Sequence, residues 1–372
     1  MAGLYIHIPF CKSRCIYCGF YSTTDLRWRQ RYVDAVCREM EIRGERKEHL
    51  ETIYLGGGTP SQLTTDQLRQ LFLYINKVYG DGEREVTIEV NPDDVTIAYA
   101  TTLSQQGINR ISMGAQTFDD ERLRFLHRRH TAAQVPLAVQ RLREAGIQNI
   151  SVDLMYGFPN ETLADWEQDI DTALALNVEH LSAYCLMIEE GTPLHKMLHS
   201  RPTSVTAPLP DEELERQMYE LLIDKLTAAG YEHYEISNFA KPGFRSRHNS
   251  SYWQDSPYIG MGAAAHSYDL KSRQWNVADL QAYMEAIERG EIPSEREEID
   301  EDTHYNDRIT VALRTSEGLD LDTLSARHRT YCEHEAQQYI DQGLLRREGS
   351  HLILTRKGLF VSDDIMSSLI FI

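Results

Sequence analysis

The first two-thirds of the chain alternates short apolar runs with longer segments whose apolar residues recur at the helical period. β-branched and aromatic residues dominate the short runs, at residues 4–8, 52–55, 86–90, 110–113, 149–154 and 180–186. Residues 25–45 and 64–79 are examples of the longer, helical segments. Strands that alternate with helices are typical of βα units, which build a parallel sheet. We therefore predict an α/β fold with six parallel strands.

Polar or glycine-rich residues follow each of these predicted strands. They are the cysteine-rich segment 11–18, residues 56–59, residues 89–92, Gln116, Asp153 and residues 184–189. In barrel-type α/β folds the loops after the strands gather on one face and build the active site. Any one of these strand ends alone would be ordinary turn chemistry. Six such strand ends that converge on the same opening of a barrel indicate a functional site.

The pattern changes after about residue 210. A predicted helix at residues 212–229 leads into a glycine- and aromatic-rich stretch at 231–268, and the polar, acidic residues 292–302 are typical of a linker. The last part shows helical patterns at residues 305–313, 321–327 and 331–342, two short strands at 344–347 and 351–355, and a final helix. We therefore predict three parts, at residues 1–210, 211–290 and 303–372, of which the last is a small winged-helix-like α+β domain.

The charge balance limits the partners of the protein. Among 372 residues, 57 are acidic and 38 are Lys or Arg, which gives a formal net charge of −19. Nucleic acid is not expected as a partner, because phosphate binding needs clustered positive charge. Protein docking or site closure is the better interpretation of the winged-helix-like part. No run approaches the about 18 apolar residues of a membrane span, and the start lacks a signal-peptide pattern, so we expect a cytoplasmic protein without an integral membrane segment.

Three of the six cysteines lie close together, directly after the first predicted strand. Cys11, Cys15 and Cys18 have C-x3-C-x2-C spacing, which points to a metal or iron–sulfur site because thiolates are the preferred ligands there. A zinc site would need a fourth ligand, for which His7 is the candidate. A [4Fe–4S] cluster could instead be held by the three cysteines, with one iron open to a chelating small molecule.

These features together resemble the radical S-adenosylmethionine (SAM) superfamily. The resemblance rests on the cysteine motif with Tyr17 before its third cysteine, on its place after the first strand, and on the Gly-Gly-Gly-Thr loop at residues 56–59. It implies a partial, TIM-like (β/α)6 barrel and a [4Fe–4S] cluster held by the three cysteines. It also implies that the open iron takes the amino and carboxylate groups of SAM, whose reductive cleavage gives a 5′-deoxyadenosyl radical with electrons from an external donor.

Longer motifs resemble the oxygen-independent coproporphyrinogen III oxidase group over essentially the whole chain. They are Tyr-Ile-His-Ile-Pro-Phe-Cys at residues 5–11, Gly-Gly-Gly-Thr-Pro-Ser at 56–61, Ser-Val-Asp-Leu-Met-Tyr-Gly-Phe-Pro at 151–159 and Leu-Arg-Thr-Ser-Glu-Gly-Leu at 313–319. Members of that group bind two SAM molecules. The resemblance assigns the first SAM to Tyr5, Gly57 and Glu89. It assigns the second to Tyr17, Gly58, Thr59, Gln116, Arg128, Asp153 and Cys185, with Arg129 as the alternative to Arg128.

Two departures separate this chain from the oxidases of the group. The oxidases carry a further cysteine two residues after the third, where this chain has Phe20, and an N-terminal extension, where this chain has ten residues before Cys11. Both departures are features of the haem chaperone branch of the group, HemW. The resemblance therefore favours a chaperone over an oxidase.

A third motif agrees with that branch. Residues 248–253, His-Asn-Ser-Ser-Tyr-Trp, match its H-N-x-x-Y-W pattern. Imidazole is a common axial ligand of haem iron, and aromatic rings pack on the macrocycle, so His248, Tyr252 and Trp253 are candidates for haem contact. His266, in a run rich in glycine and alanine, is a second candidate ligand, although such a run is more typical of tight backbone packing.

The resemblance thus implies a haem chaperone that binds one [4Fe–4S] cluster, SAM and haem, and passes haem to an acceptor protein. Two alternatives remain at this point. One is oxidative decarboxylation of coproporphyrinogen III, and the other is another radical SAM reaction on a tetrapyrrole. The motifs leave open whether SAM is cleaved, and they assign no residue a catalytic role.

Overall fold

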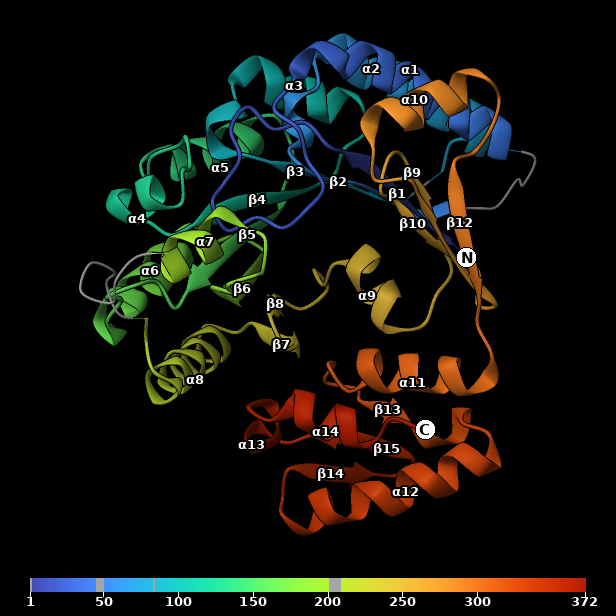
Figure 1. Ribbon diagram of the computed structural model, residues 1–372. Coiled ribbons are helices and arrows are strands. Elements are labelled where there is room, and N and C mark those ends of the chain that lie inside the picture. Colours follow the sequence, from blue (N-terminus) through green and yellow to red (C-terminus); the bar gives the residue numbers. More distant parts are fainter. Residues whose placement is uncertain (1, 45–49, 83, 201–208) are drawn as a thin grey trace.

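The computed structural model describes residues 2–44, 50–82, 84–200 and 209–372. Its centre is one twelve-stranded sheet with the strand order β12-β11-β10-β9-β1-β2-β3-β4-β5-β6-β8-β7 (Figure 1). Six consecutive strands in it are parallel, which confirms the predicted α/β fold. They are β1 (Ala2–Ile8), β2 (Leu50–Gly57), β3 (Glu85–Val90), β4 (Arg110–Gln116), β5 (Asn149–Tyr156) and β6 (His180–Cys185).

Helices cover the outer face of these six strands (Figure 1). They are α1 (Arg29–Arg43), α2 (Thr65–Tyr79), α3 (Ile97–Gln105), α4 (Asp120–Phe125), α5 (Gln134–Glu144) and α6 (Leu163–Ala175). Helix α7 (Pro193–Ser200) packs instead against the cysteine loop, where Leu194 meets Ile16. The helix predicted at residues 25–45 is α1, preceded by a short 3₁₀ turn; residue 45 lies outside the described residues. Thr64 and Gln67 form a capping box that fixes the start of α2.

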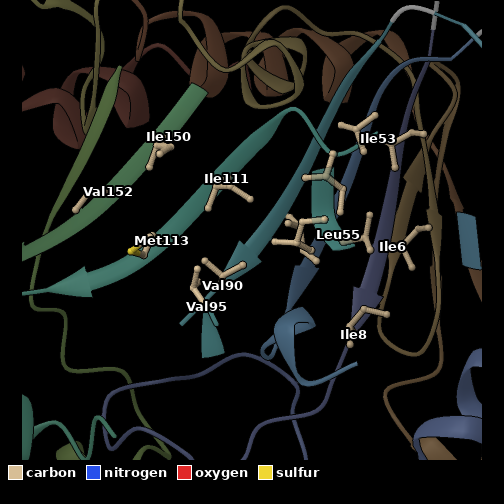
Figure 2. Close-up of a cluster of buried hydrophobic side chains, with 14 of the residues drawn as sticks. Ile6, Ile8, Ile53, Leu55, Val90, Val95, Ile111, Met113, Ile150 and Val152 are labelled. Carbon is tan, nitrogen blue, oxygen red and sulfur yellow. The ribbon is translucent and has the colours of Figure 1, made fainter. Parts of the chain in front are cut away.

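The core lies between the strands and these helices. Ile6, Ile53, Ile88 and Ile111 are fully buried on neighbouring parallel strands, and Figure 2 shows Ile6, Ile53 and Ile111 together with other apolar side chains of the same layer. The sequences of parallel strands are rich in apolar residues because helices or other chain segments cover the sheet. This explains why the short runs in the sequence identified the strands.

The middle part of the chain extends the same sheet at both ends. After α8 (Glu212–Ala228), β7 (Glu232–Glu235) and β8 (Asn238–Ala240) pair beyond β6. After α9 (Arg247–Trp253), β9 (Tyr258–Met261) pairs in parallel with β1. The edge is completed by β10 (His266–Tyr268), β11 (Ser272–Asn276) and β12 (Ser294–Glu298), with α10 (Leu280–Glu288) between the last two. The predicted boundary near residue 210 adjoins residues 201–208, which lie outside the described residues.

The predicted linker at residues 292–302 is wrong. Residues 294–298 form the edge strand β12, which pairs antiparallel with β11, and helix α11 (Glu301–Ala312) begins directly afterwards. All five residues of β12 are exposed, so the strand has no apolar residues that a sequence pattern could reveal. Its backbone pairing alone defines it, and charged side chains are common on such edge strands.

The last part is a separate small domain with its own core. Three strands, β13 (Leu319–Asp320), β15 (His351–Leu354) and β14 (Leu345–Glu348), form a sheet in that order. The predicted helices at 321–327 and 331–342 are instead a 3₁₀ turn followed by the single helix α12 (Ala326–Asp341). The chain ends with α13 (Arg356–Leu359) and α14 (Ser362–Ser368). Within the described ranges, no helix is long and apolar enough to cross a membrane.

Candidate functional site: a cysteine-lined cavity at the carboxyl ends of the parallel strands

A cavity of about 490 Å³ opens where the six parallel strands end. Its size falls in the range of small-molecule sites. The structure brings most of the predicted site residues to its wall, namely Cys11, Cys15, Tyr17, Cys18, Gly57, Gly58, Thr59, Glu89, Gln116, Arg128, Asp153 and Cys185. These residues come from segments far apart in the sequence, because the carboxyl ends of parallel strands meet at one edge.

The three cysteines of the motif share this cavity. Cys11 is buried and receives a hydrogen bond from the Thr59 hydroxyl at 3.5 Å, whereas Cys15 and Cys18 are partly exposed. Burial raises the pKa of the Cys11 and Cys18 thiols. A buried thiolate therefore needs a positive partner, which an iron ion would supply.

The chemistry of the donor set fits an iron–sulfur cluster better than zinc. Among the described residues, no three His, Cys, Asp or Glu side chains converge closely enough to hold a single metal ion. The zinc candidate His7 has both ring nitrogens engaged, with the Tyr21 carbonyl at 2.9 Å and the Tyr5 hydroxyl at 3.1 Å. The cysteines that line the cavity would hold a cluster, whose irons each need only one thiolate.

The structure distinguishes the two neighbouring arginines. Arg128 Nη1 donates to Cys15 Sγ at 3.7 Å, and its Nη2 donates to Asn91 Oδ1 at 2.8 Å and to the Gly114 carbonyl. Arg129 also reaches the cavity wall, but it forms ion pairs with Asp93 and Asp94, both at 3.0 Å. Arg128 is therefore the arginine that faces the cysteine motif.

Glu89 lies beneath the glycine loop. Its Oε2 accepts from the Gly57 amide at 3.1 Å, and its Oε1 accepts from the Tyr54 hydroxyl at 2.9 Å. Burial, opposed by the hydrogen bond from Tyr54, raises the pKa of Glu89 to about 7. Gly57 has a φ of +113°, which favours glycine, and a Cβ there would stand 2.5 Å from the His7 ring.

Asp153 and Gln116 are two further polar residues of the cavity wall. The Ser112 hydroxyl donates to Asp153 Oδ2 at 3.0 Å, and burial raises the pKa of the Asp153 carboxyl. Gln116 has a φ of +71°, an unusual backbone conformation for a residue with a side chain. Such conformations cluster at ligand sites, where the surrounding structure holds them in place.

The H-N-x-x-Y-W motif forms most of helix α9, and its histidine points away from the cavity. His248 is only 1% exposed; its Nδ1 lies 2.7 Å from the Thr52 hydroxyl and its Nε2 lies 2.8 Å from the Tyr252 hydroxyl. Its ring also stacks on Tyr54, the residue that donates to Glu89, with centroids 5.0 Å apart. Haem ligation by His248 would require one of these hydrogen bonds to break and the buried ring to become accessible.

The other haem candidates and Tyr5 lie outside the cavity wall. Trp253 packs beneath the Arg314 guanidinium, 5.3 Å from its ring, beside the C-terminal domain. His266 is exposed on β10, where it stacks on Trp275. A Cβ on nearby Gly262 would clash with the Tyr32 hydroxyl, so the glycine- and alanine-rich run is a tight packing site, as the sequence indicated.

Several cavity residues were missed by sequence reasoning. They are Arg110, Ser112, His180, Ser182, Ser246 and Asn249. Asn249 follows His248 directly, so the motif does reach the cavity, but through its asparagine. The strand residues among them occur in alternation with buried apolar residues, and this period-two pattern was the signal that could have identified them.

Comparison with known proteins agrees with this geometry. The family described as Radical SAM superfamily matches residues 5–173, and the HemN C-terminal domain matches residues 299–361. The protein named "Heme chaperone HemW" of Bacillus subtilis (strain 168) is 34% identical over 99% of this chain and 99% of its own length. The chain belongs to the HemW family. The protein of the same name from Lactococcus lactis subsp. lactis (strain IL1403) is 32% identical over 97% of this chain and 95% of its own length.

The fold of this HemW family member also occurs in an oxidase. The solved structure described as "Coproporphyrinogen III oxidase (HemN) from Escherichia coli is a Radical SAM enzyme" superimposes with a TM-score of 0.86, covers 99% of this chain and 90% of that chain, and is 22% identical. The predicted superfamily, branch and fold are thus confirmed. Membership in the superfamily implies a [4Fe–4S] cluster and SAM as cofactors.

Proposed function

We propose that this protein is a cytoplasmic haem chaperone that binds a [4Fe–4S] cluster, SAM and haem, and passes haem to an acceptor protein. The observation that carries the proposal is its membership in the HemW family along the whole chain. Phe20, in place of the further cysteine that the resemblance assigns to the oxidases, supports the same interpretation.

The cavity residues have defined roles in this proposal. Cys11, Cys15 and Cys18 would hold three irons of the cluster, and when bound it would supply a redox-active centre with one iron open to the amino and carboxylate groups of SAM. Glu89 would accept a hydrogen bond from a ribose hydroxyl. The backbone of Gly58 would approach the methionine part of SAM closely.

Arg128 would hold negative charge beside the cluster. Its guanidinium already donates to Cys15 and to Asn91, so it is oriented before any ligand enters. Gln116, Asp153 and Cys185 would complete the wall around SAM. An external donor would deliver electrons to the cluster.

Coproporphyrinogen oxidation is the second candidate, because the fold is shared with HemN. One experiment separates the two functions. Anaerobically reconstituted protein is assayed for decarboxylation of coproporphyrinogen III with SAM and a reductant, and in parallel it is titrated with haem. We expect saturable haem binding without turnover. Decarboxylation at a rate comparable with an oxidase control would refute the chaperone proposal.

A further inference from the structure

Large apolar side chains are exposed at the mouth of the cysteine-lined cavity. Phe20 is 70% exposed and Met187 is 68% exposed, and Tyr184 beside them is 43% exposed. All three line the same cavity. Apolar side chains that gather at one opening favour a ligand with an apolar surface, because their exposure to water costs free energy.

The two chain segments that carry Phe20 and Met187 are in contact with each other. Phe20 belongs to the cysteine loop, and Met187 follows strand β6. A Cβ on Gly19 would clash with the Glu189 carboxylate, which places residues 19 and 189 in contact. The Leu194 amide donates to the Ile16 carbonyl at 2.9 Å and joins the same two segments a second time. Apolar side chains from two chain segments therefore line the mouth, and the two segments are joined by direct contacts.

A positively charged side chain, that of Arg14, lies beside this apolar opening. Arg14 is exposed and lines the cavity, and its Nη2 donates to the Phe20 carbonyl at 3.5 Å. Within the described part of the chain, no carboxylate lies within ion-pair distance of Arg14, although the protein carries a net charge of −19. Arg129, also on the wall, is already paired with two aspartates. Arg14 is thus available to an anionic group of a ligand.

The size of the cavity decides where a macrocycle would lie. About 490 Å³ is in the range of small-molecule sites, and the cluster and SAM would occupy this space, so a further flat ligand of porphyrin size would cover the opening instead of entering it. The motif histidine offers no comparable surface, because His248 is buried with both ring nitrogens hydrogen-bonded.

We propose that haem lies across the mouth of the cavity, with one face against Phe20 and Met187 and a propionate toward Arg14. The proposal rests on the proposed function, since it assumes that the protein binds haem. Haem placed there covers the SAM site. Bound haem therefore blocks the path by which SAM leaves the cavity and slows its release.

The first test measures haem affinity of the reconstituted full-length protein. The double variant Phe20→Ser/Met187→Ser should bind haem roughly tenfold more weakly or worse, because two apolar contacts are lost. Phe20→Leu/Met187→Leu should retain near-native affinity, since both side chains stay apolar. Leu73→Ser and Ile97→Ser are matched controls, because these side chains are 67% and 68% exposed on the outer helices α2 and α3.

The second test addresses the propionate. Arg14→Gln should weaken binding of haem but leave binding of haem dimethyl ester unchanged, because the ester carries no negative charge. Release of prebound radiolabelled SAM should be slower with haem present, and this slowing should disappear in the Phe20→Ser/Met187→Ser variant. The visible absorption of the cluster checks that each variant is intact.

The outcomes separate this site from the function itself. Absence of haem binding by the native protein would refute the haem chaperone function. Native-like haem affinity and SAM release in the Phe20→Ser/Met187→Ser variant would refute the proposed haem site at the mouth but not the haem chaperone function. Loss of haem binding in a folded His248→Ala variant, with the mouth variants unaffected, would likewise overturn it in favour of helix α9.

Discussion

Glu89 is a carboxyl group whose surroundings favour its protonated form. Burial raises its pKa from 4.5 to about 7. The folded state therefore holds its proton over a range in which the unfolded chain has lost it. The stabilisation that this proton provides is complete below pH 4.5 and is lost as the pH rises toward 7.

We expect the free energy of unfolding of the metal-free protein to fall between about pH 5 and pH 7, by about 1.4 kcal/mol for each pH unit over which Glu89 alone titrates. Glu89→Gln should lose this component. Urea unfolding of both proteins at the two pH values measures the difference. The same slope in both would show that the pKa of Glu89 is not raised.

His248 connects the motif helix to the floor of the SAM site. It bonds Thr52 and Tyr252 and stacks on Tyr54, which in turn holds Glu89. His248→Ala should lower the stability by about 2–5 kcal/mol, because it leaves a cavity and two buried hydroxyls without partners. Thermal unfolding tests this, with His334→Ala as the control, since the His334 side chain is 83% exposed. An unchanged midpoint for His248→Ala would contradict a supporting role.

At the scale of elements, the loop between β1 and α1 carries the proposed cluster. Replacement of Cys11, Cys15 or Cys18 by Ala should remove the visible absorption of the reconstituted cluster, because each thiolate would hold a different iron. Cys37→Ala and Cys332→Ala should retain it, since these cysteines are buried within helices α1 and α12. If a Cys11, Cys15 or Cys18 variant still bound stoichiometric iron and sulfide, the cysteine replaced in that variant would not be a cluster ligand.

Elements that bury an apolar face could be predicted from the sequence. Each strand from β1 to β6 buries several apolar residues, and the order of these strands along the chain is their order in the sheet. Strand β12 could not be predicted, because Ser294–Glu298 is entirely polar and forms only where β11 offers its edge. The local pattern of apolar residues predicts which segments are buried. The pairing of an edge strand depends instead on a partner strand elsewhere in the sequence.

At the scale of the whole molecule, the C-terminal domain packs below α9 and β7 (Figure 1). The Ile236 amide donates to the Arg314 carbonyl at 3.1 Å, and the Arg314 guanidinium pairs with the buried Glu235 at 3.0 Å. None of the described residues that line the cysteine cavity comes from this domain. The C-terminal domain is therefore not placed to close the cysteine cavity, contrary to what the sequence suggested. Its other predicted role, docking of a protein, stays a prediction.

Arg314→Leu should loosen this junction, because it leaves the Glu235 carboxylate buried without its cation. We expect a loss of about 2 kcal/mol in the free energy of unfolding and faster proteolysis at the start of the C-terminal domain. Arg346→Leu is the control, since its partner Glu348 is exposed. Equal proteolysis of the two variants would show that the buried pair does not hold the domain.

Local sequence patterns were sufficient to predict the class of chemistry of this protein. The spacing of the cysteines, the glycine loop and the apolar periods are local properties of the chain. They identified the strands and the superfamily, and they predicted the cluster ligands. Which of two neighbouring side chains faces the site could be seen only in the folded chain. Arg128 faces Cys15 while Arg129 pairs with aspartates, and Asn249 reaches the cavity while His248 points into the core. Adjacent residues point in different directions, and the packing of distant segments sets which direction becomes the site.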